Sequence, residues 1–214
     1  MANNFSQLAK KSKANNTIEK VSKEQAGTPS LEIYKLGDDV LRENAKRISK
    51  VDNSIRILAK EMLQSMYAAK GIGLAAPQIN KSIRLFLIDT APFFEDQENS
   101  NNDAIKKVFI NPRIIEEKGD DWDFNEGCLS IPDIREDVIR KALVTIEYFD
   151  ENFEKHTDVF DGLNARVIQH EYDHINGVLF VDKISPLRKR MIKGKLMDIS
   201  KGKVNAAYKM RFAR

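Results

Sequence analysis

The stretch QHEYDH at residues 169–174 says more about this chain than any other, and it lies inside a longer helical pattern. Apolar residues recur at helical spacing over residues 163–175, and the Asn-Gly pair that follows is typical of a helix end. Residues four apart in a helix lie one turn apart on the same face. His170 and His174 are therefore predicted to point the same way from one helix.

This spacing indicates a divalent-metal site with Glu171 beside it as a candidate general base. Glu171 is rotated away from the line of the two imidazoles, so it can lie beside a metal ion without binding it and accept a proton from water. A short HExxH pattern can also be a solvated helix face, but only three histidines occur in the chain and two belong to the pattern. His156, the third, lies in a polar run and is interpreted as a surface histidine. We therefore expect His170 and His174 to bind one ion.

A catalytic metal site usually has three protein ligands and one open position, so a third ligand must come from elsewhere. Cys128, the only cysteine, follows a turn-like Glu-Gly step. A lone thiol can make no internal disulfide, and by itself it would be interpreted as a small buried residue. Beside two imidazoles, a thiolate would complete a Cys-His-His site. A cysteine nucleophile with a histidine base is the alternative, but it leaves one histidine and Glu171 without a role.

Residues 71–79, GIGLAAPQI, form a third informative segment between a helical pattern and a strand-like run. Small residues let backbone approach a ligand closely, and Gln78 could donate a hydrogen bond to a developing oxyanion. The segment is not a dinucleotide fingerprint, because the third glycine is absent and a helix precedes it instead of a strand. By itself it would be interpreted as a structural turn.

Together these segments resemble the peptide deformylase family. The three family motifs occur in order, as GxGLAAPQ at residues 71–78, EGCLS at residues 126–130 and HExDH at residues 170–174. The stretch YKLGDDVLR at residues 34–42 is similar to the family's N-terminal segment. The resemblance extends from about residue 31 to about residue 195.

The resemblance implies that Cys128, His170 and His174 bind one divalent metal ion, typically Fe(II), which Zn, Ni or Co can replace. It implies that Glu171 acts first as general base and then as the acid that protonates the leaving amine. The reaction is removal of the formyl group from N-formylmethionyl peptides during protein biosynthesis, with release of formate.

The resemblance also implies how the substrate is held. Gln78 and the backbone N–H of Leu129 would bind the formyl oxygen, and Ile72 and Gly73 match a loop whose backbone pairs with the peptide like an added strand. The pocket for the first side chain, usually methionine, would draw on Ile72, Leu163, Val167, His170 and Arg135.

Composition and patterning predict an α+β fold with antiparallel strands packed around a central metal-binding helix, and with a C-terminal helix. At 214 residues and 42% hydrophobic, the chain can bury a substantial core. The expected strands, rich in β-branched and aromatic residues, are 83–89, 107–111, 143–149 and 157–160. The acidic stretch 93–103 has no apolar period and is expected to be a surface loop.

Three parts of the chain differ in character. Residues 1–30, rich in Asn, Lys and Ser, are expected to be a flexible extension, residues 31–182 a catalytic deformylase-like domain, and residues 183–214 a basic C-terminal helix and tail. No run approaches the roughly 18 apolar residues of a membrane span, so no membrane contact is expected. Residues 1–30 lack the apolar core of a secretory signal, and one thiol suits a reducing compartment. We expect a bacterial cytoplasmic or an organellar protein.

The last segment is strongly basic, with 11 Lys and Arg against a single acid in residues 183–214. We predict one helix with an apolar side made of Leu187, Met191, Ile192, Leu196 and Ile199. The basic side is expected either to be solvated or to contact ribosomal RNA phosphates, a contact that the resemblance to the family implies.

Two other function classes stay open from the sequence. A zincin-like endopeptidase shares HExxH but normally takes its third ligand from another His or a Glu instead of a Cys. A metal-bound protein without catalytic activity that docks on ribosomes is the second. Assay of a formylated peptide separates both from a deformylase.

Overall fold

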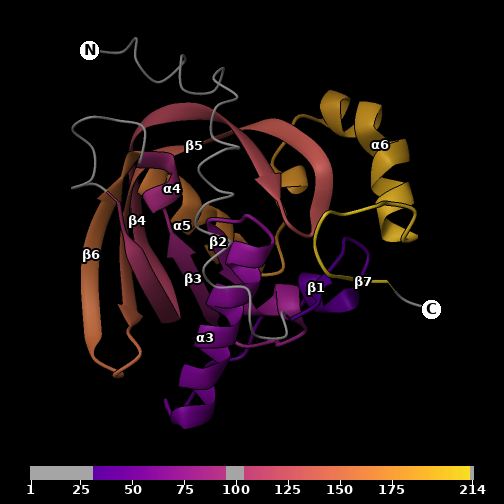
Figure 1. Ribbon diagram of the computed structural model, residues 1–214. Coiled ribbons are helices and arrows are strands. Elements are labelled where there is room, and N and C mark those ends of the chain that lie inside the picture. Colours follow the sequence, from indigo (N-terminus) through magenta and orange to yellow (C-terminus); the bar gives the residue numbers. More distant parts are fainter. Residues whose placement is uncertain (1–30, 95–103, 213–214) are drawn as a thin grey trace.

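The computed structural model describes residues 31–94 and 104–212 (Figure 1). The expected flexible extension, residues 1–30, and most of the expected acidic loop lie outside the described residues. Phe93 and Phe94, which were expected to begin that loop, instead end the short helix α4 (Ala91–Phe94). Within the described ranges, no helix is long and apolar enough to cross a membrane.

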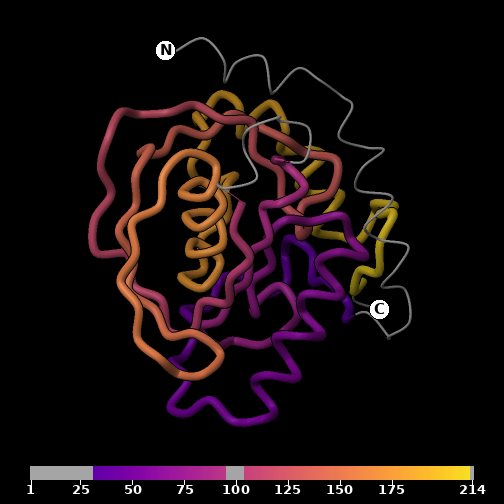
Figure 2. The backbone as a smooth tube through the Cα atoms, turned by 60° about the vertical axis from the view of Figure 1, so that its left-hand side comes forward, coloured from indigo at the N-terminus to yellow at the C-terminus, as the bar shows by residue number. Residues whose placement is uncertain are grey.

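An antiparallel sheet with the strand order β2-β3-β4-β5-β6 dominates the described part of the chain. Its two longest strands, β4 and β5, form a ribbon whose register shifts at several points, and such bulges bend a sheet. Figure 2 shows this ribbon and β6 curving around one helix, α5. The strand bounds are β2 (Gly73–Ala75), β3 (Leu85–Asp89), β4 (Lys106–Cys128), β5 (Ile131–Phe149) and β6 (Lys155–Asp161).

The predicted α+β class is confirmed, with the metal-binding helix at the centre and a C-terminal helix at the edge (Figure 1). A parallel pair, β1 (Ile33–Tyr34) and β7 (Met210–Arg211), joins the two ends of the described chain. The remaining elements are α3 (Asn53–Ala68), α5 (Gly162–His174), α6 (Pro186–Ser200) and the 3-10 turns η1 (Asp39–Arg42), η2 (Ala76–Ile79) and η3 (Phe180–Asp182).

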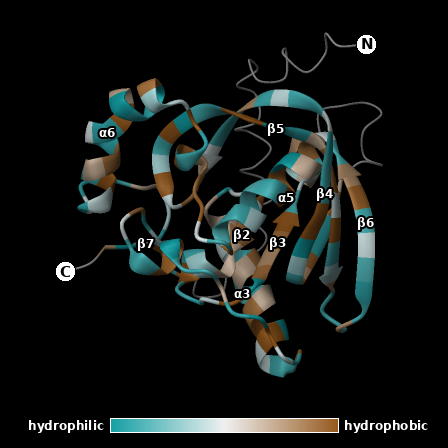
Figure 3. Cartoon of the chain, turned by 180° about the vertical axis from the view of Figure 1, so that it is seen from behind, coloured by the Kyte–Doolittle hydropathy of each residue, from teal (hydrophilic) through white to brown (hydrophobic). Residues whose placement is uncertain are grey.

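Helix α5 is fixed by an aromatic cluster on the concave side of the sheet. Phe109 stacks on Phe86 with ring centroids 4.7 Å apart and lies 4.4 Å from Tyr148. The apolar side of α5, including Ala165 and Ile168, packs against this cluster. Figure 3 shows the interior strand β3 as almost continuously hydrophobic, as expected for a strand buried on both faces.

The end of α5 is fixed by the predicted glycine. Gly177 has φ +72°, and a Cβ there would lie 2.6 Å from the carbonyl oxygen of Arg42. A side chain is therefore excluded by both conformation and contact. This close approach holds the histidine-bearing end of α5 against the N-terminal part of the domain.

All the expected strands are found, but the β4–β5 ribbon is much longer than expected. Residues 112–128 and 131–142 extend the two strands, although their sequence is rich in charged residues. Residues 121–128 pair with residues 131–141, and the extensions expose many of their side chains, so they do not show the apolar runs of a buried strand. Cys128 therefore lies at the end of a strand, directly before a two-residue turn.

The predicted apolar side of α6 is correct for only half of the helix. Ile192, Leu196 and Ile199 pack against the body of the protein. Leu187 and Met191 are instead 67% and 66% exposed, because the first half of α6 stands away from the body. Arg188 in this half reaches back to Glu136 on β5 with two hydrogen bonds of 2.8 and 2.9 Å.

We expect Phe109→Ala to lower the free energy of unfolding by about 3–5 kcal/mol, because it leaves a cavity between α5 and the sheet. Ile57→Ala on α3, where the side chain is 51% exposed, is the matched control and should change it by less than about 1 kcal/mol. Urea unfolding followed by circular dichroism measures both. Equal effects of the two substitutions would contradict the assignment of the core.

Candidate active site

The three predicted metal ligands meet at one point. Cys128 ends β4, while His170 and His174 lie one turn apart on α5. Their ligand atoms all lie within 4.8 Å of one another, and Cys128 Sγ is 3.2 Å from His174 Nε2. A thiolate with two imidazoles is a donor set that suits iron or zinc better than magnesium or calcium. The cluster fits a divalent transition-metal ion.

Glu126 orients the first histidine. Its carboxylate Oε2 lies 2.9 Å from His170 Nδ1, which leaves the other ring nitrogen for a metal. Arg140 donates to both carboxylate oxygens, at 2.6 and 2.9 Å. Burial alone would raise the pKa of Glu126, but the hydrogen bonds from Arg140 and His170 outweigh burial and hold the pKa far below its usual range. Glu126 is therefore a buried anion behind the metal ligands.

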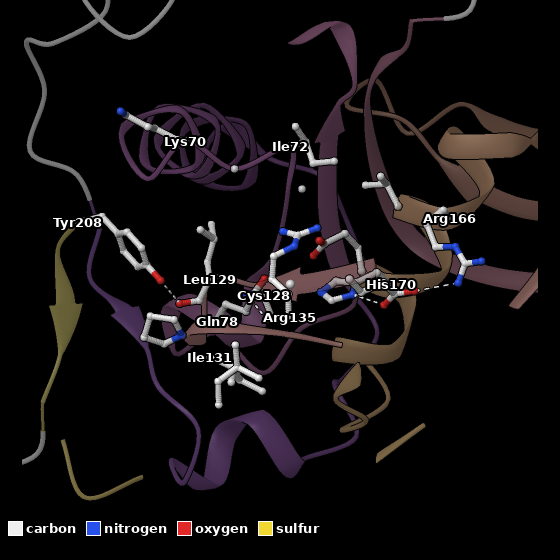
Figure 4. Close-up of a pocket in the computed structure, with 18 of the residues that line it drawn as sticks. Lys70, Ile72, Gln78, Cys128, Leu129, Ile131, Arg135, Arg166, His170 and Tyr208 are labelled. Atoms are coloured by element: carbon white, nitrogen blue, oxygen red, sulfur yellow. Dashed lines mark hydrogen bonds and ion pairs between the residues drawn. The ribbon is translucent and has the colours of Figure 1, made fainter. Parts of the chain in front are cut away.

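Arg166 is a second cation on the same carboxylate. Its guanidinium donates to Glu126 Oε1 at 3.0 Å and to the carbonyl of Val138 at 2.9 Å. The ring of Trp122 lies over the guanidinium, 4.7 Å from its carbon atom, and Phe124 lies 5.7 Å away. The aromatic side chain of Trp122 thus covers an ion pair. Figure 4 shows Arg166 and His170 at the same side of the pocket, and both contact the carboxylate of Glu126.

Arg140 also bonds to the second half of the HExDH motif. It donates to Asp173 at 2.6 Å, and Lys183 lies 3.2 Å from the other oxygen of that carboxylate. Arg140 therefore bonds to two acidic residues, Glu126 on β4 and Asp173 on α5.

Glu171 lies against the backbone of β2. Its side chain is buried, and among the described residues its Oε2 has no hydrogen-bond partner. Burial raises the pKa of Glu171 to about 7 in the absence of a metal, and a nearby divalent cation would favour the ionised form. A Cβ at Gly73 would lie 2.8 Å from the carboxyl carbon, so this approach requires glycine.

Gln78 points at the turn that carries Cys128. Its Oε1 accepts a hydrogen bond from the backbone N–H of Ala75 at 2.8 Å, so its Nε2 faces the site. That nitrogen lies 3.6 Å from Cys128 Sγ and 3.2 Å from Ser130 Oγ. The hydrogen bond from Ala75 thus orients the Gln78 amide with its donor toward the site.

A cleft of about 500 Å³ opens beside these groups. It is lined by all the residues that the sequence assigned to the substrate, namely Ile72, Gly73, Leu129, Arg135, Leu163 and Val167, and by Gln78, Cys128, His170 and Glu171. His174 is fully buried behind this surface. Arg135 is held by Asn125 through a hydrogen bond of 2.9 Å from its Nε to the side-chain oxygen.

Several cleft residues were not identified from the sequence. The cleft is also lined by Phe124, Ile131, Pro132 and Tyr208. Glu126 contacts the ligand His170, and Arg166 contacts Glu126. Glu126 belongs to the EGCLS motif, which was the available signal for it. Tyr208 lies in the C-terminal tail, 79 residues from the leucine that it contacts, and no local pattern indicates such a contact.

Comparisons with known proteins agree with this geometry. A family model described as polypeptide deformylase matches residues 30–190. The peptide deformylase of Christiangramia forsetii is 56% identical over 187 residues, which cover 85% of this chain and 95% of that protein. The peptide deformylase of Prochlorococcus marinus subsp. pastoris is 59% identical over 196 residues, covering 90% and 94%.

Solved structures give the same result. A peptide deformylase from Synechococcus elongatus, in complex with actinonin, is 42% identical with a TM-score of 0.68, over 87% of this chain and 95% of that chain. One from Legionella pneumophila is 37% identical with a TM-score of 0.71, over 82% and 98%. The chain therefore belongs to the peptide deformylase family, and it is a metal-dependent hydrolase that removes the formyl group from N-terminal formylmethionine.

Proposed function

We propose that Cys128, His170 and His174 hold Fe(II), with Zn, Ni or Co as possible replacements, and that Glu171 moves the proton during deformylation. The observation that carries the second part is the position of the Glu171 carboxylate. It is buried beside the ligand cluster, faces the cleft and has one oxygen without a partner among the described residues. When bound, the metal supplies a Lewis acid that activates water and polarises the formyl carbonyl.

Glu171 acts twice in the proposed reaction. It first accepts a proton as a water oxygen adds to the formyl carbon. It then gives that proton to the amide nitrogen as the C–N bond breaks, so formate and a free amino terminus leave. The burial of Glu171 strengthens its interaction with the reacting groups. Gly73 permits the close placement of the carboxylate.

Two donors are proposed for the formyl oxygen. Gln78 offers its Nε2, whose direction is set by the hydrogen bond between Oε1 and Ala75. The second donor is the backbone N–H of Leu129, directly after Cys128. Donors fixed before the reaction stabilise negative charge at no cost in reorganisation.

The peptide is proposed to lie along β2. Ile72 and Gly73 would pair with its backbone like an added strand. Leu163, Val167 and Arg135 line the same cleft and would surround the first side chain, which is methionine in the substrate. The apolar character of Leu163 and Val167 suits a thioether side chain.

We expect Glu171→Gln to abolish detectable formate release from a formyl-Met peptide while metal binding is kept, because the amide cannot carry the proton. Protein loaded anaerobically with Fe, Ni or Zn is assayed for formate, and metal content is measured on the same sample. Glu117→Gln, the same substitution at an exposed position on β4 outside the cleft, is the control.

Other outcomes would favour other functions. Cleavage of internal peptide bonds would favour a zincin-like endopeptidase. Absence of any hydrolysis by correctly loaded wild-type protein would leave a metal-bound docking protein. Full activity of Glu171→Gln would contradict the proposed proton path.

We further propose that the exposed basic face of α6 contacts ribosomal RNA. Arg190, Lys193 and Lys195 are exposed and make no ion pair within the described residues. The exposed Leu187 and Met191 lie on the same helix. An enzyme that acts on new formylated chains would gain from binding where they emerge, in a bacterial cytoplasm or in an organelle.

We expect the triple variant Arg190→Glu/Lys193→Glu/Lys195→Glu to sediment less with ribosomes at low salt than the wild-type protein does. Added salt should also weaken the binding of the wild-type protein to ribosomes. A control that reverses Lys60, Lys81 and Lys118 makes the same change in net charge on other surfaces. Formate release by both variants should stay at the wild-type level. Binding that is indifferent to salt and to the α6 changes would rule out this contact.

A further inference from the structure

The C-terminal tail forms part of the wall of the cleft. We define the C-terminal strap as residues 203–209, which lead from the end of α6 to β7. Three of its residues, Ala206, Ala207 and Tyr208, line the cleft. The strap is fixed at both ends, since the N–H of Lys203 donates to Asp198 at 2.8 Å and the N–H of Ile33 donates to Lys209 at 3.0 Å.

Within the strap, Tyr208 makes the most specific contact with the site. Its hydroxyl donates a 2.6 Å hydrogen bond to the carbonyl oxygen of Leu129, and its ring packs against the same buried cluster as the Leu129 side chain. Figure 4 shows the two side chains next to each other, with Gln78 and Cys128 beyond Leu129. A residue near the C-terminus is thus bonded to the backbone directly after a metal ligand.

The turn at residues 128–131 is held from three separate parts of the chain. Gln78 lies 3.2 Å from Ser130 Oγ, and the N–H of Leu36 donates to the carbonyl of Ser130 at 2.8 Å. Tyr208 holds the carbonyl of the residue before. The turn interrupts the regular ladder, because the β4–β5 register shifts between Gly127 and Cys128. Its peptide groups therefore depend on these contacts for their orientation.

We propose that Tyr208 is a positioning residue for deformylation: its hydroxyl fixes the peptide group between Leu129 and Ser130. This restrains the backbone of Leu129, so that its N–H, in the preceding peptide group, points at the formyl oxygen. This rests on the role proposed above for that N–H. It also extends the catalytic unit beyond residue 182 to the strap, so the tail is needed for chemistry and not only for docking. The strap contributes no ligand and no proton, and it acts through the turn.

The test compares Tyr208→Phe with Tyr34→Phe. The first change keeps the ring in the cleft and removes only the hydroxyl. Tyr34 lies on the adjacent strand β1, and within the described residues its hydroxyl makes no hydrogen bond, which makes it a matched control. Both variants are loaded with the same metal, and kcat and KM are measured with a formyl-Met peptide.

We expect kcat of Tyr208→Phe to fall about 3–10-fold, the range that loss of one hydrogen bond gives, with KM and bound metal unchanged. Amide hydrogen exchange of residues 128–131 should become faster, while the midpoint of urea unfolding should fall by no more than the loss of one hydrogen bond gives, so the variant stays folded in the assay. Tyr34→Phe should match the wild type in all of these measurements.

A wild-type kcat for Tyr208→Phe would overturn the proposal, and so would a loss of kcat that follows a loss of bound metal or unfolding of the variant under the assay conditions. Failure of the proposed function is separate, because it would appear as absence of formate release by the wild-type protein itself.

Discussion

The buried carboxylate of Glu126 is the contact on which the active site depends. It joins the three elements that form the site, because Glu126 lies on β4, Arg140 on β5, and Arg166 and His170 on α5. A buried anion is stable only when it is paired and hydrogen-bonded, and removal of one partner leaves an uncompensated charge. The position of α5 against the β4–β5 ribbon is therefore specified by charge as well as by the aromatic cluster around Phe109.

The metal site follows from this arrangement. Cys128 lies two residues beyond Glu126 on the same strand, so the contact that orients His170 also fixes the approach of the thiolate to α5. Asp173 gives Arg140 a second partner between the two histidines. Hydrogen bonds of this kind to metal ligands set their direction and basicity, and their loss commonly weakens metal binding about 10–100-fold. Glu171, on the same helix, is left facing the cleft.

The helix, its two histidines and the cysteine could be predicted because each depends on a local pattern. The contacts around them could not be predicted, because an arginine on a helix is usually solvated. Only the fold brings Trp122 and Glu126 next to Arg166. The length of the β4–β5 ribbon was missed since most charged side chains of residues 112–142 are exposed, so the segment lacks the apolar pattern of a buried strand. The packing of the C-terminal segment could not be predicted from the spacing of its apolar residues. This packing leaves Leu187 and Met191 exposed and brings Tyr208 to Leu129.

The central claim is that one sulfur and two imidazole nitrogens from Cys128, His170 and His174 bind a single metal ion. X-ray absorption at the metal edge of zinc-loaded protein tests it directly. The account predicts one sulfur at about 2.3 Å and two nitrogens at about 2.0–2.1 Å, with the remaining position filled by a light atom. The sulfur contribution should disappear in Cys128→Ser, whereas a spectrum with only nitrogen and oxygen neighbours in the wild-type protein would contradict the account.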